Sequence, residues 1–169
     1  MKIRVMTAAA LLALAGCILL CGCGSKDADN QTVAPVSEVG SLNGSASDTL
    51  RASMTVDNVT PGGLTVHFNL HEKRNEVLFG DSFRLEQRVG EDWAEVPVIR
   101  EDYGFNLVGY LLTEGTERTM DVDWEWLYGR LSPGTYRIVK ELVDTERRTP
   151  GGQPLKYELS AEFTIAMSE

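Results

Sequence analysis

Apolar and polar residues alternate one by one in three segments of the chain. In residues 64–70, leucine, valine and phenylalanine occupy every second position, with threonine, histidine and asparagine between them. Residues 120–126 and 156–165 show the same alternation. Successive side chains of a strand point to opposite faces, so each segment predicts a strand with one buried and one hydrated face. No segment has the apolar spacing of a long amphipathic helix.

Shorter segments rich in apolar residues add to these strands. They cover residues 53–59, 82–89, 93–96 and 136–143. Stretches rich in glycine and proline, such as Thr60–Gly63 and Ser132–Gly134, separate the segments and predict turns. The sequence therefore predicts an all-β fold, an antiparallel sandwich of about seven strands. All 13 aromatic residues lie at or after Phe68, which places the packed core in the C-terminal two-thirds.

The N-terminus has the organisation of an export signal. A basic start, Met1–Arg4, precedes an uncharged apolar run from Val5 to Leu20. This run is shorter than the ~20 residues that span a bilayer, so we expect a signal peptide in residues 1–22. The motif Leu20-Cys21-Gly22-Cys23 resembles a bacterial lipobox, which implies acylation of Cys23 and a lipid anchor on the extracytoplasmic side of the cell membrane.

Two alternatives to acylation at Cys23 remain. Leu14-Ala15-Gly16-Cys17 fits the lipobox pattern slightly better, but an apolar segment would then follow the lipidated cysteine. The other alternative is an ordinary signal peptide with incidental cysteines. All three cysteines lie between residues 17 and 23. If Cys23 is the first mature residue, the exported part has neither a disulfide nor a thiol for metal binding or catalysis.

A polar segment separates this signal from the predicted strands. Residues 24–50 contain no aromatic residue and are dominated by Ser, Gly, Asn, Asp and Thr. Such a composition buries too little apolar area to offset the entropy lost on ordering. We therefore expect residues 23–50 to be a lipidated, flexible tether, with an r.m.s. span of about 30 Å. The folded domain is then expected in residues 51–169.

One long motif of the domain resembles a known family. The segment Asp123–Glu141, with Leu131-x-Pro133-Gly134-x-Tyr136 at its centre, is similar to the hallmark of bacterial immunoglobulin-like domains carried on Gram-positive cell-surface lipoproteins. Further similarities lie in residues 59–66, 83–86, 93–97 and 161–165. The resemblance implies an immunoglobulin-like sandwich and carries over no catalytic residue, ligand residue or cofactor.

The centre of this motif has a physical interpretation. Tyr136 follows a tight corner, and in immunoglobulin-like sandwiches such a tyrosine can hydrogen-bond back to the corner backbone. Tyr136 and Ile138 should then point inward. Lys140 would follow on the same face, which conflicts with an apolar interior. A bulge, or a position at the rim of the sandwich, would resolve this conflict.

The two histidines offer little for a metal site. His67 and His71 project to the same face of one predicted strand, with Glu72 beside them. Four residues of strand separate them by about 13 Å. One ion with ligand bonds of ~2 Å cannot join them without a sharp bend. We therefore expect a hydrated strand face, with no metal and no cofactor.

The sequence likewise has no residue pattern that predicts an active site. Asp121, Asp123 and Glu125 are spaced as acid–base pairs are, but alternation places them on the hydrated face, where nothing tunes their pKa values. Motifs for a serine nucleophile or a phosphate loop are absent. Trp93, Trp124 and Trp126 could stack on sugars, yet the last two have buried parity and are expected in the core. Trp93, beside a predicted hairpin, is the better candidate for partial exposure.

Charge limits the partners. The 16 basic and 25 acidic residues give a net charge of −9, which disfavours nucleic acid because phosphate binding needs a basic surface. We expect a monomeric, non-catalytic module that binds a protein, peptide or glycan at the cell surface. The alternatives are a small cell-envelope enzyme such as a cell-wall hydrolase, and a structural spacer without a ligand.

The predicted contact surface is one tip of the sandwich. The loops of residues 71–81 and 144–156 should meet there, because the corresponding connections of immunoglobulin-like sandwiches share one end. The first strand would also begin there, so the tether would leave from this tip. Basic residues in these loops could dock on lipid headgroups, but neighbouring acidic residues cancel their charge. The contact residues expected for a partner are Arg74, Phe79, Arg147 and Arg148; the alternative is that both loops are simply solvated.

Overall fold

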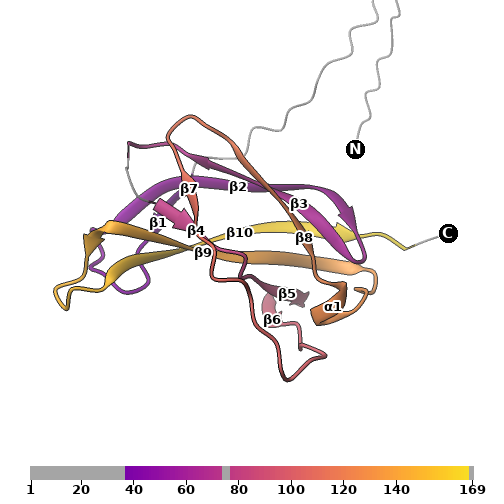
Figure 1. The fold of residues 1–169 in the computed structure, drawn as a ribbon. Helices are drawn as coiled ribbons and strands as arrows, with labels where there is room; N and C mark the ends of the chain where they lie inside the picture. The colour runs from indigo at the N-terminus through magenta and orange to yellow at the C-terminus, as the bar shows by residue number, and fades with distance from the viewer. Residues whose placement is uncertain (1–36, 74–76, 168–169) are drawn as a thin grey trace, which may run out of the picture. The chain divides into compact units, whose positions relative to one another are not determined.

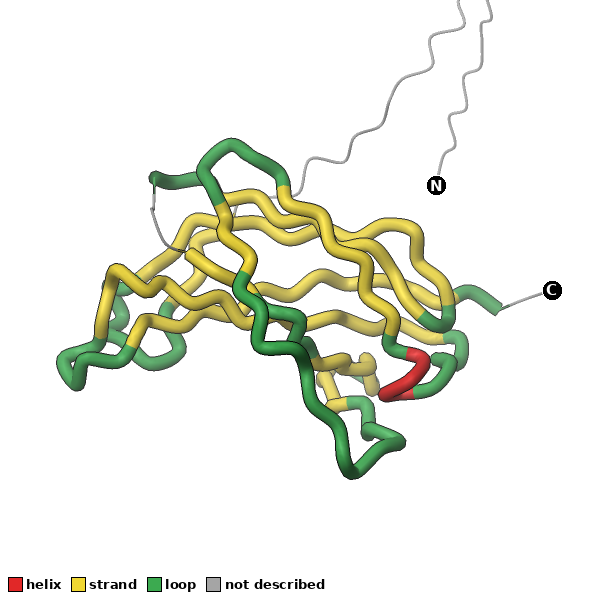
Figure 2. Tube along the Cα trace, in the orientation of Figure 1, coloured by secondary structure: helices red, strands yellow, loops and turns green. Residues whose placement is uncertain are grey.

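Strands account for most of the described chain, and the longest of them form where the sequence alternates. The structure is a computed structural model that describes residues 37–73 and 77–167. It consists of two antiparallel sheets that pack as a sandwich (Figure 1). Among these residues, helix is confined to one short turn, shown in red in Figure 2. The predicted all-β sandwich is confirmed, with ten strands in the described part of the chain where about seven are expected from the sequence.

The first sheet has the order β1-β2-β3-β8. Its strands are β1 (Ser37–Gly40), β2 (Thr49–Thr60), β3 (Gly63–Leu70) and β8 (Arg118–Asp123). The hairpin between β2 and β3 closes at Thr60, whose hydroxyl accepts hydrogen bonds from the backbone N–H groups of Gly62 and Gly63. A Cβ at Gly63 would lie 2.4 Å from the Val122 carbonyl oxygen. Only glycine therefore lets β8 approach β3 this closely.

The second sheet is built around one long strand. Its members are β4 (Val77–Phe79), β5 (Arg84–Val89), β6 (Asp92–Glu95), β7 (Tyr110–Leu112), β9 (Gly134–Arg148) and β10 (Pro154–Ile165). β10 pairs with one edge of β9. Along the other edge, β5 pairs with residues 136–139 and β4 with residues 142–144. Residues 80–83 thus bridge a break between β4 and β5, directly beside Lys140.

The core between the sheets is apolar and rich in aromatic rings. Trp124 and Phe163 stack with their ring centroids 5.4 Å apart, and Tyr136 stacks on the same phenylalanine. At the other end, Phe68 and Phe79 stack at 4.2 Å. Each of these rings is buried. Large buried rings of this kind contribute much of the stability of a domain that is built from short strands.

Strand β8 ends earlier than its alternation suggests. The Asp123 carboxylate accepts a hydrogen bond from the Glu125 backbone N–H, and the chain turns into the helix α1 (Glu125–Tyr128). Gly129, with φ of 72°, ends the helix in a conformation that suits glycine. Residue 126 therefore does not continue the buried row of β8, and Trp126 is 38% exposed.

The folded domain begins before residue 51. Residues 37–50, predicted as part of the tether, contribute β1, the start of β2 and the connection between them. The Asn43 side chain donates to the Pro154 carbonyl at 2.8 Å and accepts from the Lys156 N–H at 2.9 Å. The polar side chains that suggest disorder instead bind backbone groups of β10. Residues 1–36, which include the predicted signal and both candidate lipidation cysteines, lie outside the described residues.

The first described strand also changes where the chain enters the domain. β1 runs antiparallel to β2, with Ser37 opposite Ala52 and Gly40 opposite Thr49. The chain therefore runs toward the predicted tip over β1 instead of starting there. No helix within the described ranges is long and apolar enough to cross a membrane.

Candidate functional site

A cleft of about 560 Å³ opens where β8, at the edge of the first sheet, faces the loops that follow β4 and precede β7. One wall is β8 itself, from Arg118 to Asp123. Residues 79–83 and 104–106 form the opposite wall, and Trp126 of α1 lies at one end. The cleft therefore lies beside the break between β4 and β5. Its aromatic lining consists of Phe79, Phe83, Phe105, Tyr110 and Trp126.

Two aromatic side chains of the cleft, Phe105 and Trp126, contact each other and Tyr103, and all three remain partly accessible. The Phe105 ring lies 6.0 Å from Trp126 and 6.0 Å from Tyr103, and the last two are 6.4 Å apart, all edge to face. Tyr103 is 46% and Trp126 38% exposed. The Trp126 indole N–H donates to the Asp123 carbonyl at 2.9 Å, which fixes its orientation. Ordered rings that remain accessible are typical of binding surfaces.

Polar groups line the same cleft. The Asp81 carboxylate accepts a hydrogen bond from the Asn106 amide at 3.1 Å. Its hydrogen bond with Tyr110 raises the pKa of that phenol. Asp121 accepts a hydrogen bond from the Thr65 hydroxyl at 2.8 Å. The Arg118 guanidinium donates to the Leu111 carbonyl at 3.1 Å. The cleft thus combines an apolar floor with carboxylates at its rim.

Lys140 is fully buried beside residues 79–83, which form one wall of the cleft. The inward row of β9 continues without a bulge through Tyr136, Ile138, Lys140 and Leu142, so neither the bulge nor the rim position expected for Lys140 is observed. Its ammonium group donates to the Gly80 carbonyl at 2.6 Å, which the break between β4 and β5 leaves available. Burial lowers the pKa of Lys140 to about 8, despite the opposing charge of Asp81.

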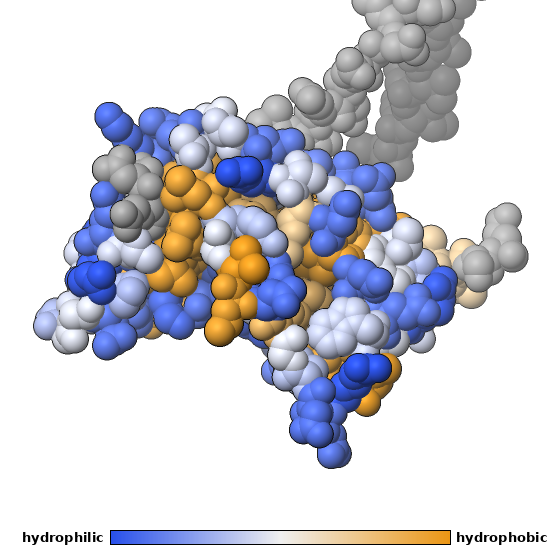
Figure 3. Space-filling view, in the orientation of Figure 1, coloured by the Kyte–Doolittle hydropathy of each residue, from blue (hydrophilic) through white to orange (hydrophobic). Residues whose placement is uncertain are grey.

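A second hollow of about 530 Å³ adjoins the cleft on the surface of β4 and β9. Leu107 and Val108 line it from the loop before β7, and both are exposed. Leu111 of β7 is also exposed at 40%. Apolar side chains gather on the same face of the molecule in Figure 3. Several accessible apolar side chains thus lie around the cleft, and exposed patches commonly mark interaction sites.

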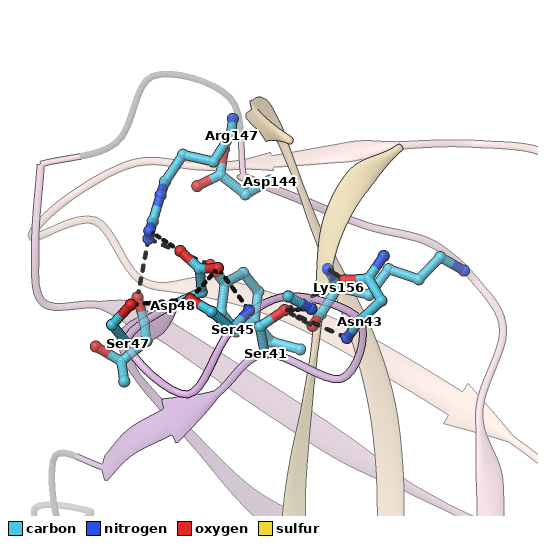
Figure 4. A network of polar contacts seen from close by, with 11 residues as sticks. Ser41, Asn43, Ser45, Ser47, Asp48, Asp144, Arg147 and Lys156 are labelled. Carbon is cyan, nitrogen blue, oxygen red and sulfur yellow. Dashed lines mark hydrogen bonds and ion pairs between the residues drawn. The ribbon is translucent and has the colours of Figure 1, made fainter. Parts of the chain in front are cut away.

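Parts of the two predicted tip loops, residues 71–81 and 144–156, belong to β4, β9 and β10, and their described residues engage neighbouring groups. The ends of both loops lie beside the start of β2: the His71 N–H donates to the Arg51 carbonyl at 2.9 Å, and Arg147 reaches the Thr49 carbonyl at 3.4 Å. Arg147 also forms an ion pair with Asp48, and Asp144 accepts its backbone N–H (Figure 4).

The four predicted contact residues thus have different positions. Arg147 is held in the ion pair, and Arg148 is exposed and donates to the Gly152 carbonyl at 3.0 Å. Phe79 is buried in the core at 3% exposure, so its placement in an exposed loop is wrong: it belongs to β4 and stacks on Phe68. Arg74 lies outside the described residues.

The histidines occupy separate sites. His67 lies between two carboxylates, with Nε2 at 3.1 Å from Asp57 and Nδ1 at 3.2 Å from Glu117. Burial alone would lower the pKa of His67, but the two carboxylates outweigh burial and raise it. His71 instead contacts the Ser53 hydroxyl at 2.8 Å. Within residues 37–73 and 77–167, no group of three His, Cys, Asp or Glu is arranged to hold a metal ion.

The structure also shows the positions of the acidic residues and tryptophans that the sequence offered as candidates. Asp121, Asp123 and Glu125 are exposed, and Glu125 pairs with Arg130 at 3.1 Å. Trp124 is fully buried, as predicted, and donates to the Pro61 carbonyl at 2.9 Å. The core assignment is wrong for Trp126, because β8 ends at Asp123. Trp93 is half-buried beneath two guanidinium groups of β5 and β9.

The corner before β9 matches the prediction for Tyr136. Its hydroxyl donates to the Ser132 carbonyl at 3.0 Å, back across the turn that starts the strand. A family model described as a bacterial Ig-like domain matches residues 48–164. The chain belongs to this family of bacterial Ig-like domains. The predicted immunoglobulin-like fold is thereby confirmed. Neither a curated protein nor a solved structure matches the chain.

Membership in the family narrows the function without naming a ligand. A bacterial Ig-like domain is an interaction or structural module, and the family is generally non-enzymatic. The Ig-like domain of this chain adds a feature that the sequence analysis missed, namely the cleft along β8. Its outer wall comes from residues 104–109, which show no alternation and lie in a long connection between β6 and β7. The cluster of aromatic residues at 103, 105 and 110 is a sequence signal for this wall of the cleft.

Proposed function

We propose that this protein is a membrane-anchored extracytoplasmic lipoprotein whose Ig-like domain is a non-catalytic binding module. The observation that carries the binding role is the aromatic-lined cleft, with accessible Trp126 in its lining and accessible Tyr103 in contact with it. A domain that served only as a spacer would gain nothing from accessible rings, because exposed apolar surface invites association. The cleft replaces the tip as the proposed contact surface, since Phe79 is buried and Arg147 is engaged in an ion pair.

The anchor rests on the sequence of the first 27 residues. A basic start, an apolar run and a lipobox-like motif precede the hydrophilic residues Gly24–Asp27. A diacylated cysteine with a further acyl chain holds a protein to a bilayer far more firmly than a single chain does. We therefore assign acylation to Cys23, with Cys17 as the alternative.

A pair of cysteine substitutions tests the anchor. Cys23→Ala should move the protein from the membrane to the soluble fraction, or leave the precursor uncleaved. Cys17→Ala is the matched control and should leave the protein in the membrane. Release by Cys17→Ala alone would assign lipidation to the other cysteine, and membrane association of the cleaved form of both variants would argue against a lipid anchor.

Capture from the cell envelope tests the binding role. The full chain in detergent is used as bait, and captured proteins and glycans are compared between wild type, Trp126→Ala and Arg148→Glu. Both positions are exposed, so neither substitution should unfold the domain. We expect Trp126→Ala to lose the partner and Arg148→Glu to retain it. The opposite pattern would place the contact surface at the tip. If the wild type captures no specific partner, the domain is better explained as a spacer.

A further inference from the structure

The cleft follows the edge of β8 instead of crossing one of its faces. Six consecutive residues, Arg118–Asp123, line it, although alternate side chains of a strand point to opposite faces. A hollow can contact every successive residue only along the strand edge, where the backbone is accessible. β8 pairs with β3 on its other edge alone, so it is an edge strand of the first sheet.

The backbone groups that face the cleft can be identified from the hydrogen-bond pattern. The Trp124 N–H donates to the Gly62 carbonyl at 2.9 Å, so this residue directs its backbone toward β3. Backbone direction alternates along an antiparallel strand, so Thr119, Asp121 and Asp123 direct theirs toward the cleft. The Trp126 indole, which donates to the Asp123 carbonyl, confirms this direction.

The middle of this edge remains available. Among the hydrogen bonds of the described residues, none uses the backbone N–H or carbonyl of Thr119 or Asp121. Trp126 closes one end of the edge by occupying the Asp123 carbonyl. The edge of β10 differs, because Leu42 and Asn43 bind its backbone at Pro154 and Lys156. Unpaired strand edges are templates for pairing with another chain.

We infer that an extended peptide segment of a partner adds to β8 as a further strand of the first sheet, with its apolar side chains in the aromatic cleft. The inference rests on the proposed binding role of the cleft and names the kind of partner. In recognition by strand addition, backbone hydrogen bonds supply affinity, and pockets for alternate side chains supply specificity.

The side chains beside the edge define the chemistry of this segment. Inward-facing Met120 and Val122 flank the aromatic lining, so alternate residues of the partner should be apolar. Outward-facing Asp121 and Asp123 carry negative charge, and both are exposed. Opposite charges on neighbouring strands are stabilising. The intervening residues of the partner should therefore be Lys or Arg.

The same charges disfavour a second copy of this chain. Pairing of two β8 edges would bring the Asp121 and Asp123 carboxylates of both copies together, and like charges on adjacent strands are destabilising. A glycan could stack on Trp126 but would not need the backbone groups of Thr119 and Asp121. Strand addition accounts for both the rings and the open backbone.

Synthetic peptides test the inference with the full chain in detergent. The probe is acetyl-Lys-Leu-Lys-Val-Lys-Leu-Lys-amide, and its affinity is measured by calorimetry. Two derivatives carry N-methyl groups, one on the amides of the lysines and the other on the amides of the apolar residues. Alternate amides of an added strand face β8 and solvent, so one derivative should bind at least roughly tenfold more weakly and the other should bind as the probe does.

Charge is tested on the protein side. Asp121→Asn removes the carboxylate but keeps the backbone and an acceptor for Thr65, and it should weaken binding of the lysine peptide severalfold. Glu162→Gln, on the exposed face of β10, is the matched control and should leave the affinity unchanged. Replacement of every lysine of the probe by glutamate should abolish binding. Equal weakening by both protein variants would contradict the inference, because the charge of Asp121 would then have no local role beside an added strand.

The outcomes separate this inference from the proposed function. Equal effects of the two N-methylated derivatives, or none from either, would overturn strand addition. So would a failure of the probe to bind while a cell-wall glycan displaces the partner in a Trp126-dependent manner, and in that case the binding role of the cleft would stand. If neither binds and capture of partners is insensitive to Trp126→Ala, both proposals fail.

Discussion

Lys140→Met should change how the stability of the domain depends on pH. Lys140 is fully buried, and its ammonium group is held by the Gly80 carbonyl at 2.6 Å. The Met120 sulfur lies 3.5 Å away, and the Phe79 ring centroid 5.7 Å away. These partners compensate only part of the lost hydration, and burial lowers the pKa of Lys140 from 10.5 to about 8.

The size and sign of the effect follow from this difference in pKa. In the folded state Lys140 loses its proton near pH 8, whereas in the unfolded chain it keeps the proton until about pH 10.5. Between these values the unfolded state binds more protons, so the contribution of Lys140 to the free energy of unfolding rises with pH. At ~1.4 kcal/mol per pKa unit, the rise amounts to about 3 kcal/mol.

The variant removes this pH-dependent contribution to the free energy of unfolding and introduces one cost. Methionine carries no charge at any pH, but the Gly80 carbonyl loses its donor, which costs about 1–3 kcal/mol. At pH 7 the variant should therefore be between equally stable and about 2 kcal/mol more stable than wild type. At pH 10.5 wild type should be the more stable protein by about 1–3 kcal/mol.

Urea unfolding at several pH values measures this difference directly. The free energy of unfolding of wild type and Lys140→Met is compared at pH 7, 8, 9 and 10.5, and groups common to both proteins cancel. A difference that changes by about 3 kcal/mol across this range supports the assignment. A difference that stays constant with pH would refute it, because Lys140 would then titrate alike in the folded and unfolded chain.

Three further predictions concern single side chains of the domain. Tyr136→Phe should lower the free energy of unfolding by about 1 kcal/mol, since it removes the hydrogen bond to Ser132; no loss in urea unfolding would argue against a role for this corner. Trp124→Ala should cost about 3–5 kcal/mol, because the ring is fully buried, and a near-neutral effect would contradict its place in the core. His67→Gln should lower the thermal midpoint at pH 5.5 and not at pH 8.5, because a raised folded-state pKa gives stability that is present below pH 6.5 and lost as pH rises through the folded value. A loss of equal size at both pH values would show that the charge of His67 is not involved.

Alternation predicted the strands that have one face in the core. Residues 64–70 and 156–165 lie in β3 and β10 with the expected faces buried. The same rule failed at Trp126, because β8 ends at Asp123, whose carboxylate accepts the Glu125 N–H, and the chain then turns into a helix. At Lys140 the alternation was right, because the side chain points inward, but the expectation of a wholly apolar interior was wrong. A local break between two other strands supplies a carbonyl there, and no local pattern reveals such a break.

Composition was a weaker guide than alternation. Residues 37–50 have the polar composition of a tether, yet Leu50 is fully buried and Asn43 binds the edge of β10. Phe79 lies among residues typical of a loop, and the three-residue strand β4 that buries it is too short to show a period. The cleft depends on three segments distant in sequence, around Phe79, Phe105 and Asp121. Their proximity follows from the tertiary fold, which no local sequence pattern predicts.

The most direct test of the binding role uses the indole N–H signals of the chain. The ¹⁵N-labelled full chain in detergent has three indoles, at Trp93, Trp124 and Trp126, and the last lies at the end of the cleft. Addition of the captured partner should shift the Trp126 signal together with the backbone amides of Thr119 and Asp121. Trp124 is sealed in the core and should not move. Shifts confined to residues 147–153, with Trp126 unchanged, would contradict the account and place the contact at the tip of the sandwich.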